Sequence, residues 1–139
     1  MHNHNHPKGK EEEQMSYETI TYEIVEKGIG VLSLNRPKAY NAVNLKMVEE
    51  LEGFWNERLY DLDTAVIILK GNGEKGFCAG LDMKETMEVT PAMSVPELYR
   101  FQMRLARLNL AMRRTPQPII CAVHGAASGQ GFSFTLASD

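Results

Sequence analysis

The sequence has few cysteines, no long apolar run and little net charge. Its 139 residues include only two cysteines and carry a formal net charge of −3 at pH 7. No apolar stretch approaches the roughly 18 residues that a membrane-spanning helix needs, and the polar N-terminus lacks the apolar segment of a secretory signal. The weak charge gives no electrostatic footprint for nucleic acid. We therefore expect a cytoplasmic protein with neither membrane nor nucleic acid among its partners.

Cysteine and histidine are also informative by position. Cys78 and Cys121 are far apart in apolar surroundings and could pair, but nothing requires it, which fits a reducing compartment. Three of the four histidines alternate with asparagine near the start, as in a metal-affinity tag, although a genuine His-rich metal site is the alternative. We therefore treat residues 1–14 as a tag-like or disordered segment and residues 15–139 as the folded part.

Hydrophobic periodicity in residues 15–139 predicts alternating strands and helices. Residues 19–35 predict a β-hairpin that turns at Gly28, and Asn44 is a suitable cap for a helix whose apolar positions extend to Leu62. Ala65–Lys70 and Ile119–Val123 are short apolar runs typical of buried parallel strands.

A second long helix is predicted between these two buried strands. It runs from Pro96 to Arg114 with one apolar stripe at Leu98, Phe101, Leu105, Leu108 and Met112, and residues 84–96 before it are expected to be irregular. The alternation of strands and helices predicts an α/β domain with helical crossovers.

Two glycine-containing loops follow the two predicted buried strands. They are GNGEKGFCAGLDM and HGAASGQG, and both should lie at the carboxyl edge of a parallel sheet, where α/β folds bind ligands. Each loop could direct one backbone N–H at the same carbonyl oxygen, forming an oxyanion hole. On spacing alone, a purely structural role is the alternative, because glycine loops between strands and helices are common.

Three segments, in this order, carry a resemblance to a known family. NRPKAYNAV, GFCAGLDM and PIICAVHGAASGQGFSFTLASD resemble the motifs of the crotonase superfamily, the enoyl-CoA hydratase/isomerase family. The resemblance implies a ββα-spiral core, of which this chain has only the N-terminal part, since family members are longer. It also implies an acyl-CoA substrate, no cofactor beyond the coenzyme A of that substrate, no metal, and a homotrimer or hexamer.

The resemblance also assigns site residues. It makes the backbone N–H groups of Leu81 and Gln130 the two donors that stabilise a thioester enolate. The substrate-binding positions that it implies, along the coenzyme A and around the thioester, are Lys38, Ala39, Ala42, Ala79, Gly80, Leu81, Asp82, Met83, Lys84 and Gln130.

Two positions depart from the family pattern. Ser133 stands where classical hydratases of the family have a glutamate, and the family's other acidic residue would fall beyond Asp139. A serine hydroxyl is no base at neutral pH without an activating partner, so hydration by two glutamates is in doubt and isomerase chemistry stays open. Gln130 replaces the usual glycine, and its side chain is expected to narrow the site.

Other functions and other residues stay open as alternatives. Ser133 also suits a non-catalytic acyl-CoA-binding or scaffold protein, and GQGFSF has two glycines of a dinucleotide fingerprint, which makes an NAD-binding module a weaker alternative. We expect Asp82 to order its loop or cap the following turn, His124 to be non-catalytic, and Cys78 to fill space. Five arginines on the second long helix are expected to form a solvated face rather than a contact with coenzyme A phosphates or RNA.

Overall fold

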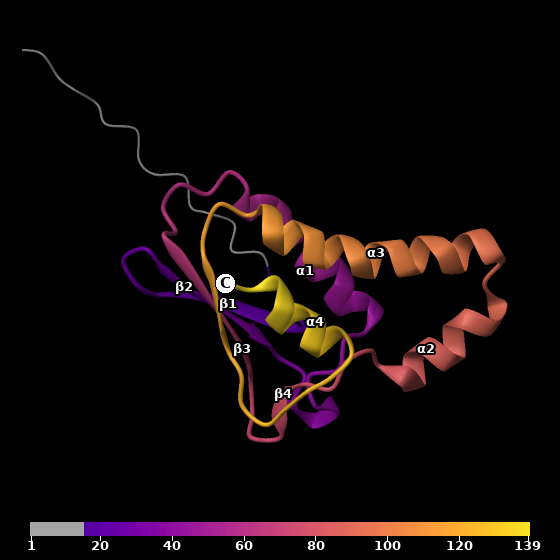
Figure 1. Ribbon diagram of the computed structural model, residues 1–139. Coiled ribbons are helices and arrows are strands. Elements are labelled where there is room, and N and C mark those ends of the chain that lie inside the picture. The colour runs from indigo at the N-terminus through magenta and orange to yellow at the C-terminus, as the bar shows by residue number, and fades with distance from the viewer. Residues whose placement is uncertain (1–15) are drawn as a thin grey trace, which may run out of the picture.

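A four-stranded sheet forms the centre of the fold in a computed structural model that describes residues 16–139 (Figure 1). The tag-like segment predicted at residues 1–14 lies outside the described residues. The strand order is β1-β2-β3-β5, with bounds Ile20–Glu26, Ile29–Leu34, Val66–Gly71 and Ile119–Ala122. β1 pairs antiparallel with β2, whereas β2, β3 and β5 run parallel. The predicted hairpin and the predicted parallel strands are therefore confirmed.

The first helical crossover is α1, Leu45–Arg58, between β2 and β3. The Asn44 side chain accepts a hydrogen bond from the Met47 N–H at 2.9 Å, so the predicted cap is confirmed. The helix buries one apolar face that includes Phe54 and Trp55. The prediction that its apolar stripe extends to Leu62 was wrong: that residue lies beyond the end of the helix and is 95% exposed.

The second crossover, between β3 and β5, contains a short α-helix before the predicted long one. α2, Met83–Val89, and a short 3-10 helix, η2 at Thr90–Ala92, occupy most of the segment predicted to be irregular. α2 buries none of its residues, and its seven residues are too few to show a sustained helical period in the sequence. Figure 1 shows α2 and the start of α3 lying away from the four-stranded sheet.

α3, Val95–Arg114, is the predicted long helix. Its first turn forms a capping box in which the Ser94 N–H donates to the Glu97 carboxylate at 2.7 Å. Four of the five predicted stripe positions are buried, from Phe101 to Met112. Leu98, in the first turn of α3, is 39% exposed.

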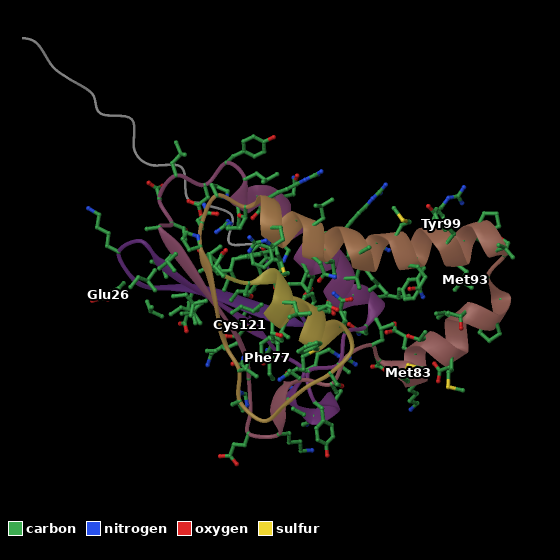
Figure 2. The ribbon with its side chains drawn as sticks, viewed as in Figure 1. Glu26, Phe77, Met83, Met93, Tyr99 and Cys121 are labelled. Carbon is green, nitrogen blue, oxygen red and sulfur yellow. The ribbon has the colours of Figure 1, made fainter. Side chains whose placement is uncertain are left out.

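A second, two-stranded sheet links the two glycine loops. β4, Gly76–Cys78, pairs in parallel with β6, Ala126–Ala127, and α4, Gln130–Ala137, follows directly. Phe77 on β4 is fully buried (Figure 2). These strands have two and three residues, too few to show a pattern in the sequence.

β5 differs from its prediction as a wholly buried strand. Ile119 is fully buried, but the next residue, Ile120, is 54% exposed. In the described part of the chain β5 lies at the edge of the sheet, with one face toward the core and the other open. In that same part, no helix is both long and apolar enough to span a bilayer.

Candidate functional site

The two glycine loops lie against each other, although about 50 residues separate them in the sequence. The Ser128 N–H donates to the Cys78 carbonyl at 3.0 Å, and the Ser128 hydroxyl donates to the Ala79 carbonyl at 2.8 Å. Together with the β4–β6 pairing, these bonds hold the end of one loop against the end of the other.

The closeness of the loops explains why their residues are small. Gly80 has a φ of +98°, which L-residues rarely adopt, and a Cβ on it would come within 2.9 Å of the Ser128 carbonyl oxygen. A Cβ on Gly131 would come within 2.4 Å of the Cys78 carbonyl oxygen. Both contacts are with backbone, which cannot move aside as a flexible side chain can.

Leu81 in the first loop and Gln130 in the second each have a backbone N–H that is not used in the hydrogen bonds between the loops. The Val43 N–H donates to the Gly80 carbonyl at 2.7 Å and the Asp82 N–H donates to the Val43 carbonyl at 2.9 Å, which leaves the intervening N–H of Leu81 outside this pairing. Gln130 is the first residue of α4, where an N–H has no acceptor within the helix. Among residues 16–139, neither N–H has a hydrogen-bond acceptor.

Leu81 and Gln130 line the same cleft, which has a volume of about 500 Å³. One wall consists of Ala79, Gly80, Leu81 and Met83, the second of Ser128, Gly129 and Gln130, and the third of Gln102, Leu105, Ala106 and Asn109 on α3. Met83 stands at the start of α2, and its side chain is exposed (Figure 2).

Sequence reasoning missed the α3 wall of this cleft. Its four residues have the spacing i, i+3, i+4, i+7 and so share one face of the helix. The apolar stripe from Phe101 to Met112 dominates the pattern of this helix, and Gln102 and Asn109 lie outside that stripe. The Gln130 side chain, expected only to narrow the site, donates from Nε2 to Asn109 Oδ1 at 2.9 Å.

The cleft contains only some of the predicted substrate-binding residues. Ala79, Gly80, Leu81, Met83 and Gln130 line it, and Lys38, Ala39, Ala42, Asp82 and Lys84 do not. The segment that contains Lys38 and Ala42 is nevertheless bonded to the first loop, since the Ala79 N–H donates to the Tyr40 carbonyl at 3.0 Å. It therefore flanks the cleft without lining it.

Asp82 has the structural role that was expected of it. Its carboxylate caps α2 by accepting from the Glu85 N–H at 3.2 Å and pairs with the Arg36 guanidinium at 2.9 Å. Burial raises the pKa of this carboxyl, but the Glu85 N–H and Arg36 lower it more, so the net shift is downward. Asp82 is thus a fixed carboxylate at the edge of the loop.

Cys78 and His124 contribute no catalytic group to the cleft. Burial raises the pKa of the Cys78 thiol to about 11, which keeps it protonated and unreactive at neutral pH. The His124 Nε2 lies 2.8 Å from the Gly73 carbonyl oxygen, on a segment that does not line the cleft.

No carboxylate from residues 16–139 lines the cleft, and Ser133 has a local partner. Its hydroxyl donates to the Gly129 carbonyl at 3.3 Å, one turn back along α4. Two of the five arginines of α3 form ion pairs, Arg104 with Glu52 at 2.7 Å and Arg113 with Asp139 at 2.8 Å.

Comparison with known proteins gives consistent results. The family model described as enoyl-CoA hydratase/isomerase matches residues 29–139. The chain is 36% identical over 119 residues to 1,2-epoxyphenylacetyl-CoA isomerase of Escherichia coli, covering 83% of this chain and 44% of that protein. It is 34% identical over 111 residues to (E)-benzylidenesuccinyl-CoA hydratase of Thauera aromatica, covering 80% of this chain and 41% of that protein.

Solved structures show the same fold. The crystal structure of enoyl-CoA hydratase from Bacillus anthracis has a TM-score of 0.79 and 31% identity, covering 88% of this chain and 46% of that chain. The chain thus spans less than half the length of the relatives that it matches. Its mixed α/β architecture is the crotonase fold over that length, as its sequence motifs predicted. The chain belongs to the enoyl-CoA hydratase/isomerase family.

Proposed function

We propose that the protein is an acyl-CoA enzyme that stabilises a thioester enolate with the backbone N–H groups of Leu81 and Gln130. The observation that carries this proposal is the meeting of two glycine loops at a single cleft of about 500 Å³, with the unbonded N–H groups of Leu81 and Gln130 on opposite loops. The proposed reaction is hydration or double-bond isomerisation of an enoyl-CoA, as the family membership suggests.

The chemistry requires donors of this kind. A proton next to a thioester carbonyl is weakly acidic, so the main barrier is the charge that develops on the carbonyl oxygen. Fixed N–H dipoles stabilise that charge without reorganising during the reaction. The N-terminal end of α4, where Gln130 lies, adds its helix dipole in the favourable direction.

The proton-transfer group is proposed to lie outside residues 16–139. No carboxylate from this part lines the cleft. The Ser133 hydroxyl donates its hydrogen bond to the Gly129 carbonyl, which is not a base that could activate it. The relatives of this chain are more than twice as long. A carboxylate from a segment outside residues 16–139 would complete the site. A single carboxylate of this kind favours isomerisation over hydration by two glutamates.

Binding of the rest of the substrate is proposed by analogy with the family. Lys38, Ala39 and Ala42 would lie along the coenzyme A, and Asp82 and Lys84 near its adenine end. No cofactor beyond coenzyme A is proposed. The family resemblance also suggests a homotrimer or hexamer and a location in the cytoplasm.

The proposal is tested by Gln130→Pro in the product of the full gene. Proline removes the N–H but is well tolerated at the first position of a helix, so the fold should be retained. Turnover of an enoyl-CoA should fall by about 10²–10³-fold, the loss typical of one oxyanion-hole donor. Gln130→Gly is the matched control, because it removes the same side chain and keeps the N–H. Undiminished turnover in the proline variant would show that this donor is wrongly assigned.

A non-catalytic acyl-CoA-binding or scaffold role is the second candidate, favoured by the lack of a carboxylate among the cleft residues described. It predicts that the full gene product binds acyl-CoA but turns over no enoyl-CoA. Turnover that depends on the Gln130 N–H would exclude it.

A further inference from the structure

Arg36 joins the segment that flanks the cleft to the loop that carries the first proposed donor. Its Nη1 donates to the Ala42 carbonyl at 2.6 Å, and its Nη2 pairs with the Asp82 carboxylate at 2.9 Å. The ion pair is largely shielded from solvent, since only 23% of the Arg36 side chain and 16% of the Asp82 side chain are exposed. These two contacts form the Arg36 bridge, in which one guanidinium holds two segments that are distant in the sequence.

Leu81, the first proposed donor, lies between two backbone hydrogen bonds to Val43. The Val43 N–H donates to the Gly80 carbonyl at 2.7 Å, and the Asp82 N–H donates to the Val43 carbonyl at 2.9 Å. The Gly80 carbonyl and the Leu81 N–H belong to one planar peptide group, so the bond to that carbonyl also fixes the direction of the N–H. The Arg36 bridge reinforces this pairing, because it binds Asp82 itself and the residue that precedes Val43.

The backbone of Arg36 is fixed in turn by Asn41. Asn41 is buried, its Oδ1 accepts from the Arg36 N–H at 2.9 Å, and its Nδ2 donates to the Asn72 and Gly76 carbonyls at 2.9 and 3.1 Å. An ion pair between two flexible surface side chains is worth little, because holding them together costs conformational entropy. Here the backbone of Arg36 is anchored, and Asp82 is already held as the cap of α2. The bridge is therefore restricted to one geometry.

We propose that Arg36 is a positioning residue that directs the Leu81 N–H at the thioester oxygen. This inference rests on the proposed function, because that function gives the N–H its role. Arg36 does not line the cleft, so it acts through Asp82 and the loop backbone instead of touching the substrate. Without the bridge, the loop gains freedom next to the donor, and a misplacement of about 1 Å costs about 10²-fold in rate.

Three variants of the full gene product separate this role from general stability. Asp82→Asn removes the charge from the ion pair but keeps a side-chain oxygen that can cap α2. Arg36→Met removes the guanidinium and keeps an unbranched side chain in its place. Arg104→Met is the matched control, because it removes a comparable ion pair, with Glu52 at 2.7 Å, that joins α3 to α1.

Steady-state turnover of an enoyl-CoA is the first measurement. An interaction made only in the transition state, once lost, lowers kcat and kcat/KM equally and leaves KM unchanged. Asp82→Asn and Arg36→Met, the two bridge variants, should each lower kcat by about 10–10²-fold at unchanged KM. Their combination should lower kcat no further than either alone, because both remove the same bridge. Arg104→Met should keep the wild-type kcat.

The infrared carbonyl band of bound butyryl-CoA, isotope-labelled at the thioester carbonyl, reports on the donor without any turnover. Hydrogen bonds to the carbonyl oxygen weaken the C=O bond and lower its stretching frequency. The wild-type band should move to lower frequency on binding, and this shift should be smaller in both bridge variants and unchanged in Arg104→Met. If Arg36→Met fails to fold by circular dichroism, Asp82→Asn carries the test alone.

The outcomes separate this inference from the function on which it rests. A carbonyl shift that is the same in the wild type and in both bridge variants would overturn the role of Arg36 and leave the proposed function standing. An equal loss of kcat in Arg104→Met would also overturn it, since general loosening of the fold would then explain the loss. A raised KM with unchanged kcat in Asp82→Asn would assign Asp82 to substrate binding instead. No carbonyl shift in the wild type would overturn both proposals.

Discussion

Gly131 offers a direct test of how closely the two loops must approach. It lies in the first turn of α4, and a Cβ there would come within 2.4 Å of the Cys78 carbonyl oxygen and 2.7 Å of the Cys78 Cβ. Ordinary contact begins at 3.4 Å, so in Gly131→Ala the start of α4 and the end of β4 must separate by about 1 Å.

Two opposing effects set the size of the change. Alanine is a better helix former than glycine by about 1 kcal/mol. Overpacking against backbone typically costs 1–3 kcal/mol, and the contact here is with backbone that belongs to the other loop. We expect Gly131→Ala to lower the free energy of unfolding by up to about 2 kcal/mol, instead of raising it by about 1 kcal/mol as an unhindered helical site would. Because the donors at Leu81 and Gln130 sit on these two segments, turnover should fall by about 10²-fold, as for a 1 Å misplacement.

Gly53 supplies the matched control. It is also a helical glycine, in α1, but an added Cβ there meets nothing within 4 Å. Gly53→Ala should therefore raise the free energy of unfolding by about 1 kcal/mol and leave turnover unchanged. Urea unfolding and enoyl-CoA turnover are measured on both variants of the full gene product.

The comparison can contradict the reasoning in two ways. If Gly131→Ala is stabilised as much as Gly53→Ala, the close contact between α4 and β4 does not exist in solution. If Gly131→Ala is destabilised but turns over normally, the contact exists and the spacing between the loops does not control the donors.

Two further predictions concern stability and thiol reactivity. Glu50→Gln should lower the free energy of unfolding by about 1–3 kcal/mol at pH 7, because its carboxylate accepts from the Glu18 N–H, the Thr19 N–H and the Thr19 hydroxyl at 2.8, 2.9 and 2.6 Å. Burial raises the pKa of Glu50 but these bonds lower it more, so the stabilisation is present above the unfolded pKa of about 4.3 and is lost as the pH falls below it. The difference between wild type and variant in urea unfolding should therefore shrink below about pH 4, and a difference independent of pH would refute this account. Iodoacetamide at pH 8 should modify Cys121 before Cys78 in the folded protein, because the Cys78 thiol is fully buried with a pKa of about 11; equal rates by peptide mass would contradict this.

Local patterns in the sequence were sufficient for the main elements. The β1–β2 hairpin, the Asn44 cap and the buried stripes of α1 and α3 each depend on residues close together in the chain. The motifs then placed Leu81 and Gln130 in corresponding loops, and the structure brings both residues to one cleft. The roles of these two residues as donors stay a prediction until the Gln130→Pro test.

The elements that were missed depend on contacts that a local pattern does not contain. α2 has only seven residues and buries none of them, so its sequence is too short and its apolar positions Met83 and Met87 too few to show a helical period. β4 and β6 are strands only because they pair with each other across about 50 residues. Asn109 became part of the site in the same way, through a partner 21 residues away.

The division of the cleft between backbone and side chains has a consequence for how such a protein can evolve. On the proposed function, the reaction depends on main-chain N–H groups, which most codon changes at Leu81 leave in place. The wall on α3 depends on side chains, from Gln102 to Asn109, which a single codon change can replace. The range of acyl groups can therefore diverge among descendants while the type of reaction is inherited unchanged. At Gln130 a codon change replaces a side chain that lines the cleft but, unless it introduces proline, leaves the N–H in place.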